Sequence, residues 1–314
     1  EFQLGSQDGF QFNMSVGYDL AGIKTEKINT FIDSMMEAKD TDSFKNAIAY
    51  AKKHADQFSR LTAAEIDAIP SAICNSATIS TLHGCPPQEI ESIANYLILE
   101  KHLNTFVKCN PTLLGYEFAW KTLNSMGYDY LVFGEFHFTD DLQYKDAIPM
   151  FKRLMALADS RGLSFGVKIT NTFPVEIKQN ELPGNEMYMS GKALFPLSIA
   201  LAAKLSRDLA GKLRISYSGG ADFFNLAKIV KAGVWPVTMA TTLLKPGGYQ
   251  RLKQLAELLR DQGYQPFRGV DVTAVTKIAE DVVSDPHYIK PIKLPPTRKT
   301  KTHVPLVDCF FAPC

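Results

Sequence analysis

The sequence predicts an α/β fold of the (βα)8 TIM-barrel class, and three observations predict it. Short runs with strand character alternate along the chain with longer helical patterns. Several short runs, such as Leu131-Val132-Phe133, are apolar on both faces, which is typical of parallel strands buried between layers. Polar residues cluster where the strands end, the face on which barrels build active sites. An open doubly wound sheet is the alternative, but no G-x-G-x-x-G follows the first strand.

The predicted elements follow in chain order. We expect strands at residues 12–17, 77–81, 105–110, 129–134, 165–171, 214–218 and 236–241. We expect helices at residues 87–102, 146–161, 192–209, 224–232 and 249–262. A glycine falls just past helical runs, as C-terminal caps do, at Gly127, Gly162, Gly211, Gly233 and Gly263. Seven strands are one short of a closed barrel, so we expect a fragment whose first strand or strands precede Glu1.

The domain organisation follows from composition. The 314 residues are 46% hydrophobic, which is enough for a large core. Residues 1–289 are predicted to form the barrel, with a helical insertion at residues 25–70, where no strand pattern occurs. Residues 290–303 form a basic, proline-rich linker. Residues 304–314 contain Cys309 and Cys314, which would begin a further ligand-binding module if more cysteines follow them.

Charge and composition exclude some functions. Lys and Arg number 34 against 33 Asp and Glu, so the chain has no bulk positive charge for nucleic acid. No apolar window is long enough to span a membrane, and no signal peptide is visible. Five widely spaced cysteines do not form a disulfide pattern. We therefore expect a cytoplasmic protein with neither a nucleic-acid partner nor a membrane span.

Two neighbouring βα units carry glycine-rich turns. Gly219 and Gly220 follow one predicted strand and precede a helix, where backbone N–H groups and the helix dipole favour an anion. Ala240 and Thr241 end the next strand, and a second glycine pair follows at residues 247–248. Phosphate sites at these positions are common in barrels. The alternative is that the glycines only form tight turns.

Lys108 and Lys168 each lie in an otherwise apolar strand. A lysine there must reach solvent, pair with an acid or perform chemistry. It could form a Schiff base or place a positive charge beside a flavin ring. The alternative is a buried ion pair with Glu135.

Cys85 lies in a Gly-Cys-Pro-Pro turn just before a helix. The helix N-terminus is expected to make its thiol more acidic, and a positioned thiol can act as a general acid. The alternative is a rigid turn with an uninvolved thiol. Cys74 and Cys109 are predicted to be inert core residues. The spacing Cys-x4-Cys of Cys309 and Cys314 cannot close a four-ligand site by itself, so further ligands are expected beyond it, unless both cysteines have no role.

Two further segments belong to the predicted site. Asn171 and Thr172 end a strand, and an asparagine amide suits the edge of a planar heterocycle. Ser190 and Gly191 precede a helix, although simple capping would also explain Ser190. Between these segments, residues 182–189 form a polar loop that we interpret as a lid over the active face.

Several longer motifs resemble the selenate reductase iron–sulfur subunit family. They are NMSVGYDL at 13–20, HGCPP at 83–87, NPTLLG at 110–115, and the stretches 182–191, 216–222 and 243–251. The likeness covers essentially the whole chain. It implies a dihydroorotate-dehydrogenase-like barrel followed by a module with 4Fe-4S, FAD and NAD(P)H sites. The chain would then contain most of the barrel and the first cluster ligands, Cys309 and Cys314.

The chain is similar, more distantly, to the flavin barrel of dihydropyrimidine dehydrogenase. The likeness implies an active-site cysteine at Cys85 and an FMN site, whose residues would be Asn171, Thr172, Ser190, Gly191, Gly219, Gly220, Ala240 and Thr241. The chain departs from that relative at Leu82, where the relative has an amide residue that contacts substrate. The extra strand predicted between Lys108 and Lys168 leaves open which lysine serves the flavin.

Three hypotheses follow. The first is the barrel of an iron–sulfur flavoprotein oxidoreductase that passes electrons between NAD(P)H-fed clusters and a small, purine- or pyrimidine-like substrate, together with other redox subunits or domains. In it, Cys85 would move a proton while Lys108 or Lys168 stabilises reduced FMN. The second is a Schiff-base lyase that acts on a phosphorylated carbonyl compound. The third is a non-catalytic scaffold barrel within a redox complex.

Overall fold

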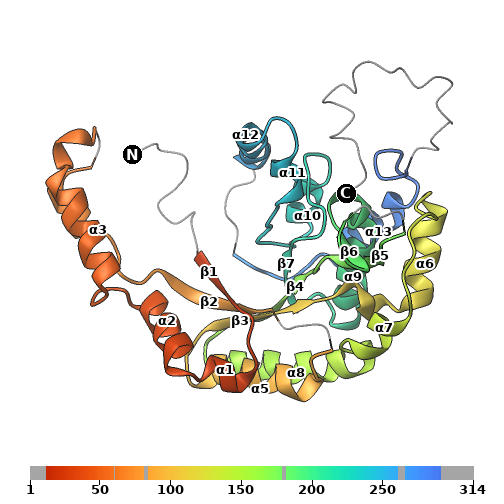
Figure 1. Ribbon diagram of the computed structural model, residues 1–314, viewed down its shortest axis with the longest axis horizontal. Helices are drawn as coiled ribbons and strands as arrows, with labels where there is room; N and C mark the ends of the chain where they lie inside the picture. The colour runs from red at the N-terminus through yellow and green to blue at the C-terminus, as the bar shows by residue number, and fades with distance from the viewer. Residues whose placement is uncertain (1–11, 60, 81–83, 179–181, 261–265, 291–314) are drawn as a thin grey trace.

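The protein is described from a computed structural model, which covers residues 12–59, 61–80, 84–178, 182–260 and 266–290. Its centre is a parallel sheet in the order β1-β2-β3-β4-β7, which curves through the middle of the molecule (Figure 1). The strands are β1 (Phe12–Val16), β2 (Cys74–Ile79), β3 (Asn104–Cys109), β4 (Phe165–Ile169) and β7 (Arg214–Tyr217). Each predicted counterpart of these strands is confirmed to within a few residues.

The sheet extends past β7 by a single bridge. Tyr217 pairs with Val237, with hydrogen bonds from Tyr217 N to Pro236 O (2.8 Å) and from Thr238 N to Tyr217 O (2.8 Å). The strand predicted at residues 236–241 is therefore only a short extended segment. Pro236 has no N–H to donate, and the chain turns into helix α11 (Thr241–Leu244) four residues after Val237.

The strand predicted at residues 129–134 is wrong. This segment is irregular, and of its large side chains Phe133 is buried whereas Tyr130 and Val132 are exposed. Phe133 contacts Phe173, with ring centroids 4.8 Å apart, and also lies against Phe138. The carbonyl of Val132 accepts a hydrogen bond from Glu176 N (2.7 Å). Phe133 is buried between α7 (Phe136–Asp140) and the residues that follow β4, whereas Val132 is 39% exposed, so the run is apolar without being a sheet strand.

The next feature, a β-hairpin, was not predicted. Strands β5 (Phe173–Glu176) and β6 (Glu186–Met189) pair antiparallel and follow directly on β4. Most of the loop interpreted as a lid is therefore this second strand and the turn before it. Glu186 at its start is the register partner of Glu176 of β5, and its carboxylate lies 2.8 Å from His137 Nε2 of α7. The hairpin is thus fixed to α7 beside the strand ends.

Helices cover the outer side of the sheet. Helices α5 and α8 pack against each other below it in Figure 1, and α9 packs against β4 and α13. Alternate strand residues, including Val107, Val167 and Ile215, are fully buried against these helices. The helices are α5 (Pro87–Leu99), α6 (Tyr116–Ser125), α8 (Tyr144–Ser160), α9 (Phe195–Asp208), α10 (Leu226–Lys231), α12 (Tyr249–Leu259) and α13 (Val272–Val282). Positive φ angles mark the predicted caps Gly127, Gly162, Gly211 and Gly233, whereas Gly263 lies outside the described residues.

The segment 25–70 is helical where the structure describes it. After α1 (Leu20–Ile23) come α2 (Glu26–Met36), α3 (Asp42–Lys53), the short turn η1 (Ala55–Gln57) and α4 (Ala63–Asp67). Helix α3 has no buried residue and lies far from the sheet in Figure 1. Within the described ranges, no helix has the length and apolar character needed to cross a bilayer.

Candidate active site

Lys108 and Lys168 stand side by side on β3 and β4. They are register partners in the parallel ladder, and Ser216 of β7 is the next partner of Lys168. Their neighbours Val107 and Val167 are buried against the outer helices, so the two lysines point to the inner face of the sheet. Because residues 129–134 form no strand, nothing separates the two lysines. They therefore belong to one site.

Burial lowers the pKa of both amino groups. The positive charge of Lys168 lowers the pKa of Lys108 further, whereas burial is the cause for Lys168. Glu135 is exposed before α7, and among the described residues no ion pair joins it to either lysine. The predicted alternative of a buried pair with Glu135 is therefore wrong. Two half-buried amines at strand ends can carry chemistry that depends on charge.

Cys85 follows β2 and directly precedes α5. Its thiol is partly buried, and burial is the main reason that its pKa is raised. The carboxylates of Glu89, in the first turn of α5, and Asp19 raise it further. The expectation that the helix N-terminus makes this thiol more acidic is therefore wrong, because desolvation and two acids act in the opposite direction. A thiol that keeps its proton is suited to donate it.

The other described cysteines are in the core, as predicted. Burial raises the pKa of Cys109 to about 12, and Cys74 donates a hydrogen bond to the carbonyl of Ser76 (3.0 Å). Both thiols are buried, which is typical of structural cysteines. Cys309 and Cys314, and also Leu82, lie outside the described residues. Within the described residues, no group of three or more His, Cys, Asp or Glu side chains could hold a metal ion.

A small cavity of about 20 Å³ joins Cys85 to Lys108. Asn110 and Asp141 also line it. Asp141 is 5% exposed and accepts hydrogen bonds from Asn110 Nδ2 (2.9 Å) and from the backbone of Gly84 (3.2 Å). Sequence reasoning missed Asp141, because an Asp-Asp pair at the end of a short helix resembles a solvated surface. The cavity brings together the predicted cysteine and one predicted lysine.

The Gly219-Gly220 turn is fixed through its carbonyl groups. The buried hydroxyl of Tyr217 donates to Gly219 O (2.7 Å), and Asn225 Nδ2 donates to Gly220 O (3.0 Å). In a trans peptide the next N–H points away from the carbonyl, so the N–H groups of Gly220 and Ala221 face away from these donors. No acceptor for either N–H is found within the described part of the chain. The turn therefore presents two backbone donors.

The glycines of this turn also permit close packing. A methyl group at Gly219 would overlap Ser198 Oγ, which lies 2.6 Å from Thr170 Oγ1. A methyl group at Gly220, where φ is +75°, would overlap the carbonyl of Gly191. The predicted alternative, glycines that serve tight turns, is thus part of the answer. Packing and an anion cradle are compatible, because packing uses the Cα side and the cradle uses the N–H groups.

The remaining predicted residues gather around this turn. Ser190 Oγ lies 3.2 Å from Thr241 Oγ1, and a methyl group at Gly191 would lie 2.8 Å from Thr241 Cγ2. Ala240 is exposed and precedes α11, and Thr242 Oγ1 donates to Ala221 O (2.9 Å). The loops that follow three separate elements thus meet at one place. Two hydroxyl groups and two free N–H groups lie there.

Asn171 and Thr172 connect this region to the lysines. The backbone N–H of Asn171 donates to Cys109 O (2.9 Å), and Asn171 Oδ1 accepts from Thr172 N (3.0 Å). Ser218 Oγ donates to Thr170 O (3.1 Å), which ties the glycine turn to the end of β4. No partner for Asn171 Nδ2 is found within the ranges described. An amide donor therefore lies two residues past the end of β4, the strand that contains Lys168.

A second network supports the turn from behind, and it was not predicted. Asp222 Oδ1 accepts from Phe224 N (2.8 Å), and its Oδ2 lies 3.2 Å from His287 Nε2. Tyr288 also donates to Asp222 Oδ1 (3.3 Å), and burial raises its pKa. These contacts join the turn to the segment after α13, far away in sequence. Spacing alone gives no signal for a contact of this range.

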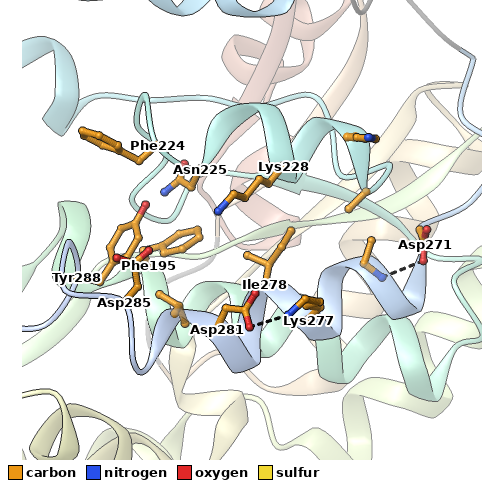
Figure 2. A pocket seen from close by; sticks show the side chains of 14 residues that line it. Phe195, Phe224, Asn225, Lys228, Asp271, Lys277, Ile278, Asp281, Asp285 and Tyr288 are labelled. Carbon is orange, nitrogen blue, oxygen red and sulfur yellow. Dashed lines mark hydrogen bonds and ion pairs between the residues drawn. The ribbon is translucent and has the colours of Figure 1, made fainter.

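Two larger cavities lie away from these residues. One, of about 410 Å³, lies between α10 and α13, and Figure 2 shows Lys228 reaching into it above Ile278. None of the sequence-predicted site residues lines it. The other, of about 730 Å³, surrounds Arg214 at the amino ends of β4 and β7. In barrels that end of the sheet serves stability, so we place the candidate site at the carboxyl ends.

Parallel strands joined by helices, with polar groups gathered at their carboxyl ends, define an α/β barrel domain of the TIM class. The family described as "Oxidoreductase YgfK, N-terminal TIM-barrel domain" matches residues 1–290. The chain belongs to this family, and the predicted fold class is confirmed.

The chain is 44% identical over 320 residues to "Putative oxidoreductase YgfK" of Escherichia coli K12, and to the protein of the same name from strain O157:H7. The alignment covers 98% of this chain and 31% of each relative, so the chain spans about a third of the length of the relatives it matches. The predicted membership of an oxidoreductase family is therefore confirmed.

A ligand-free dihydroorotate dehydrogenase from Eimeria tenella is a structural neighbour with 14% sequence identity and a TM-score of 0.34. The match covers 73% of this chain and 70% of that one. A similarity this low says nothing of function.

Proposed function

We propose that this chain is the FMN-binding barrel of a longer iron–sulfur flavoprotein oxidoreductase. The observation that carries the proposal is the row of groups along the carboxyl ends of β3, β4 and β7. Two half-buried lysines stand at one end of the row, and two unpaired backbone N–H groups stand at the other. A flavin nucleotide needs both, a positive charge near its ring and donors for its phosphate.

The phosphate end fits an anion. The N–H groups of Gly220 and Ala221 face away from the donors that hold the turn, and the hydroxyl groups of Ser190 and Thr241 lie 3.2 Å apart. We propose that these donors, with Gly219 and Gly191 keeping the backbones close, hold the FMN phosphate. Ala240 would contribute its backbone at the start of α11.

The ring end fits the lysines, and the register favours Lys168 as the flavin lysine. Lys168 is the partner of Ser216, two residues before Ser218 and three before Gly219, whereas Lys108 lines the cavity of Cys85. We propose that Lys168 places positive charge beside the ring, with Asn171 and Thr172 at its edge. Lys108 then faces the substrate.

When bound, FMN supplies the capacity to exchange a hydride with substrate. The chain's own residues then position the substrate and handle its proton. Cys85, whose raised pKa keeps its thiol protonated, holds a proton at Sγ for a planar heterocyclic substrate of the purine or pyrimidine kind. Lys108, beside the same cavity, orients an electron-rich atom of that substrate. Selenate as an acceptor has the support of the family resemblance alone.

Electrons would arrive from a module that follows the barrel. We propose that residues 290–303 are its tether and that Cys309 and Cys314 are the first ligands of a 4Fe-4S cluster, with FAD and NAD(P)H bound farther on. The partners are then a small-molecule substrate and other redox domains or subunits, in the cytoplasm. The length of the relatives leaves room for such a module.

The decisive experiment is a visible spectrum of the full-length protein with extraction and chromatography of its flavins. FMN and FAD must be separated, because both absorb in the same bands. We expect one FMN per chain, reduced to a small fraction in the double variant Ser190→Ala/Thr241→Val while FAD is retained. Full-length protein that contains no FMN and takes up none on reconstitution would contradict the proposal.

The lysine pair also favours a second function, a Schiff-base lyase acting on a phosphorylated carbonyl compound. A desolvated lysine beside a second positive charge is a known route to a reactive amine, and Lys108 has this environment. Borohydride reduction with dihydroxyacetone phosphate, followed by mass spectrometry, would then label Lys108 or Lys168. Absence of a stable adduct on either lysine in the native protein would exclude this function for the probe used.

A further inference from the structure

We propose that Asp141 is a positioning residue, which holds the Cys85 loop against the end of β3. The proposal rests on the proposed function, in which Cys85 handles the proton. Asp141 follows α7 and is 5% exposed. No motif in the sequence assigns it a role.

The Asp141 carboxylate joins two loops that the sheet places side by side. Its Oδ1 accepts from Gly84 N (3.2 Å), in the loop after β2. Its Oδ2 accepts from Asn110 Nδ2 (2.9 Å) and from Thr112 Oγ1 (2.7 Å), in the loop after β3. Gly84 immediately precedes Cys85, so the contact fixes the backbone from which the thiol projects.

The carboxylate is itself held in place. Gln143 Nε2 donates to the backbone carbonyls of Asp141 (2.6 Å) and Phe138 (2.8 Å), which fixes the turn after α7. A buried carboxylate is costly unless its oxygens accept hydrogen bonds, and here both oxygens do. Asp141 also lines the cavity of Cys85 and Lys108, so the buried carboxylate lies at the candidate site.

The loop has a matching feature at Gly84. Its φ is +79°, a conformation that favours glycine, and a methyl group there would overlap the side chain of Asp140. The loop thus approaches the segment 140–141 more closely than another residue would allow. Asp140 is exposed and makes no hydrogen bond to the loop within the described residues, so it is a matched control one position away.

The test is the rate at which iodoacetamide alkylates Cys85 in the full-length protein, measured peptide by peptide with mass spectrometry. Cys74 and Cys109 report any opening of the whole fold, because both are buried. The variants are Asp141→Ala, Asp141→Asn and the control Asp140→Asn. The reaction needs no flavin, so it is run with and without added FMN.

We expect Cys85 to be alkylated several-fold faster in Asp141→Ala than in the native protein, with the alkylation rates of Cys74 and Cys109 unchanged. Asp141→Asn should lie between, because its amide oxygen can still accept at one of the two oxygen positions while its NH₂ group cannot accept at the other. Asp140→Asn should match the native protein. An unchanged Cys85 rate in a folded Asp141 variant would overturn the proposal, and so would a parallel rise at all three cysteines. If Asp141→Ala does not fold, Asp141→Asn decides. If the native protein binds no FMN but the Cys85 rates are as expected, the flavin proposal alone would be overturned.

Discussion

Lys108 of β3 and Lys168 of β4 are direct partners in the parallel ladder, and the charge of one lowers the pKa of the other. Two half-buried amino groups on the same face of a sheet repel each other when both carry a proton. The arrangement is unfavourable for stability while both amines carry a proton, and an anion or an electron-rich ring beside the charges would relieve it. It is therefore the feature of the fold on which the proposed ligand site chiefly rests.

Removing one charge should raise the pKa of the other amine. We expect Lys168→Met to shift the pH profile of Lys108 acetylation, measured by competitive labelling and mass spectrometry, to higher pH. The sign follows because Lys168 disfavours the protonated form of Lys108. Lys204→Met is the control, since Lys204 lies over Tyr144 on the outer helices. A Lys108 profile that is the same in all three proteins would contradict the interaction.

Stability should depend on pH through the same residue. Because the pKa of Lys108 is lowered from 10.5 in the folded state, the unfolded chain binds more protons between the lowered value and 10.5. The free energy of unfolding should therefore rise with pH across that window, by at most about 1.4 kcal/mol per pH unit for one proton. We expect Lys108→Met to flatten this rise in urea unfolding. Equal slopes for the variant and the native protein would argue against the lowered pKa.

The glycine turn should show a double-mutant rescue. In Gly219→Ala, the new methyl group would overlap Ser198, and we expect a loss of about 1–3 kcal/mol in unfolding free energy. Ser198→Gly removes the obstacle, although it also removes the 2.6 Å contact with Thr170 and places a glycine in α9. The double variant should therefore be more stable than the sum of the single effects predicts. Strict additivity would show that the close approach is not the reason for glycine.

The Cys85 thiol should become more acidic when Glu89 loses its charge. Glu89 and Asp19 both raise its pKa, and Lys108 and Asp141 face it across the cavity. In Glu89→Gln the oxygen can still accept the hydrogen bond from Leu20 N (2.8 Å), so the contact between α1 and α5 is kept. We expect the pH profile of Cys85 alkylation to move to lower pH.

The control for this change is Glu91→Gln. Glu91 lies on the same helix but pairs with Arg153, 2.7 Å away. Its replacement should leave the Cys85 profile in place. If both variants shift the pH profile of Cys85 alkylation equally, the shift comes from the change in net charge of the protein and not from the position of Glu89.

Much of the fold could be predicted, because burial on one face and a period of two or 3.6 residues leave their mark on the sequence. Residues 129–134 show where this fails. An apolar run predicts burial on both sides, but here Val132 is 39% exposed, and Phe133 is buried against Phe138 and Phe173 instead of within a sheet. Because residues 129–134 form no strand, β3 and β4 are neighbours in the sheet and the two lysines lie side by side.

The candidate site could be predicted only where residues with reactive or hydrogen-bonding groups lie in the turns that follow strands. Gly219, Gly220, Ser190 and Thr241 could be grouped because glycine pairs and hydroxyls follow strands. Asp141 could not, because its role depends on contacts with Gly84 and Asn110, more than thirty residues away in sequence. The rise in the pKa of Cys85 also depends on burial, which spacing does not report.

Tyr217 should connect stability to FMN affinity. Its hydroxyl is buried and donates to Gly219 O (2.7 Å), so Tyr217→Phe leaves that carbonyl without a donor. We expect a cost of about 1–3 kcal/mol in unfolding free energy, the range for an unsatisfied buried group. Because the same hydrogen bond orients the N–H of Gly220, FMN affinity should also fall.

Tyr144→Phe separates the two effects. Tyr144 donates to Asp208 (2.7 Å) between α8 and α9, away from the turn. It should lower stability without changing the dissociation constant for FMN, measured by fluorescence quenching of the free flavin at a temperature where both variants are folded. If Tyr217→Phe binds FMN as tightly as Tyr144→Phe does, the carbonyl contact does not orient the phosphate donors, and the cradle at Gly220 and Ala221 is not the FMN site.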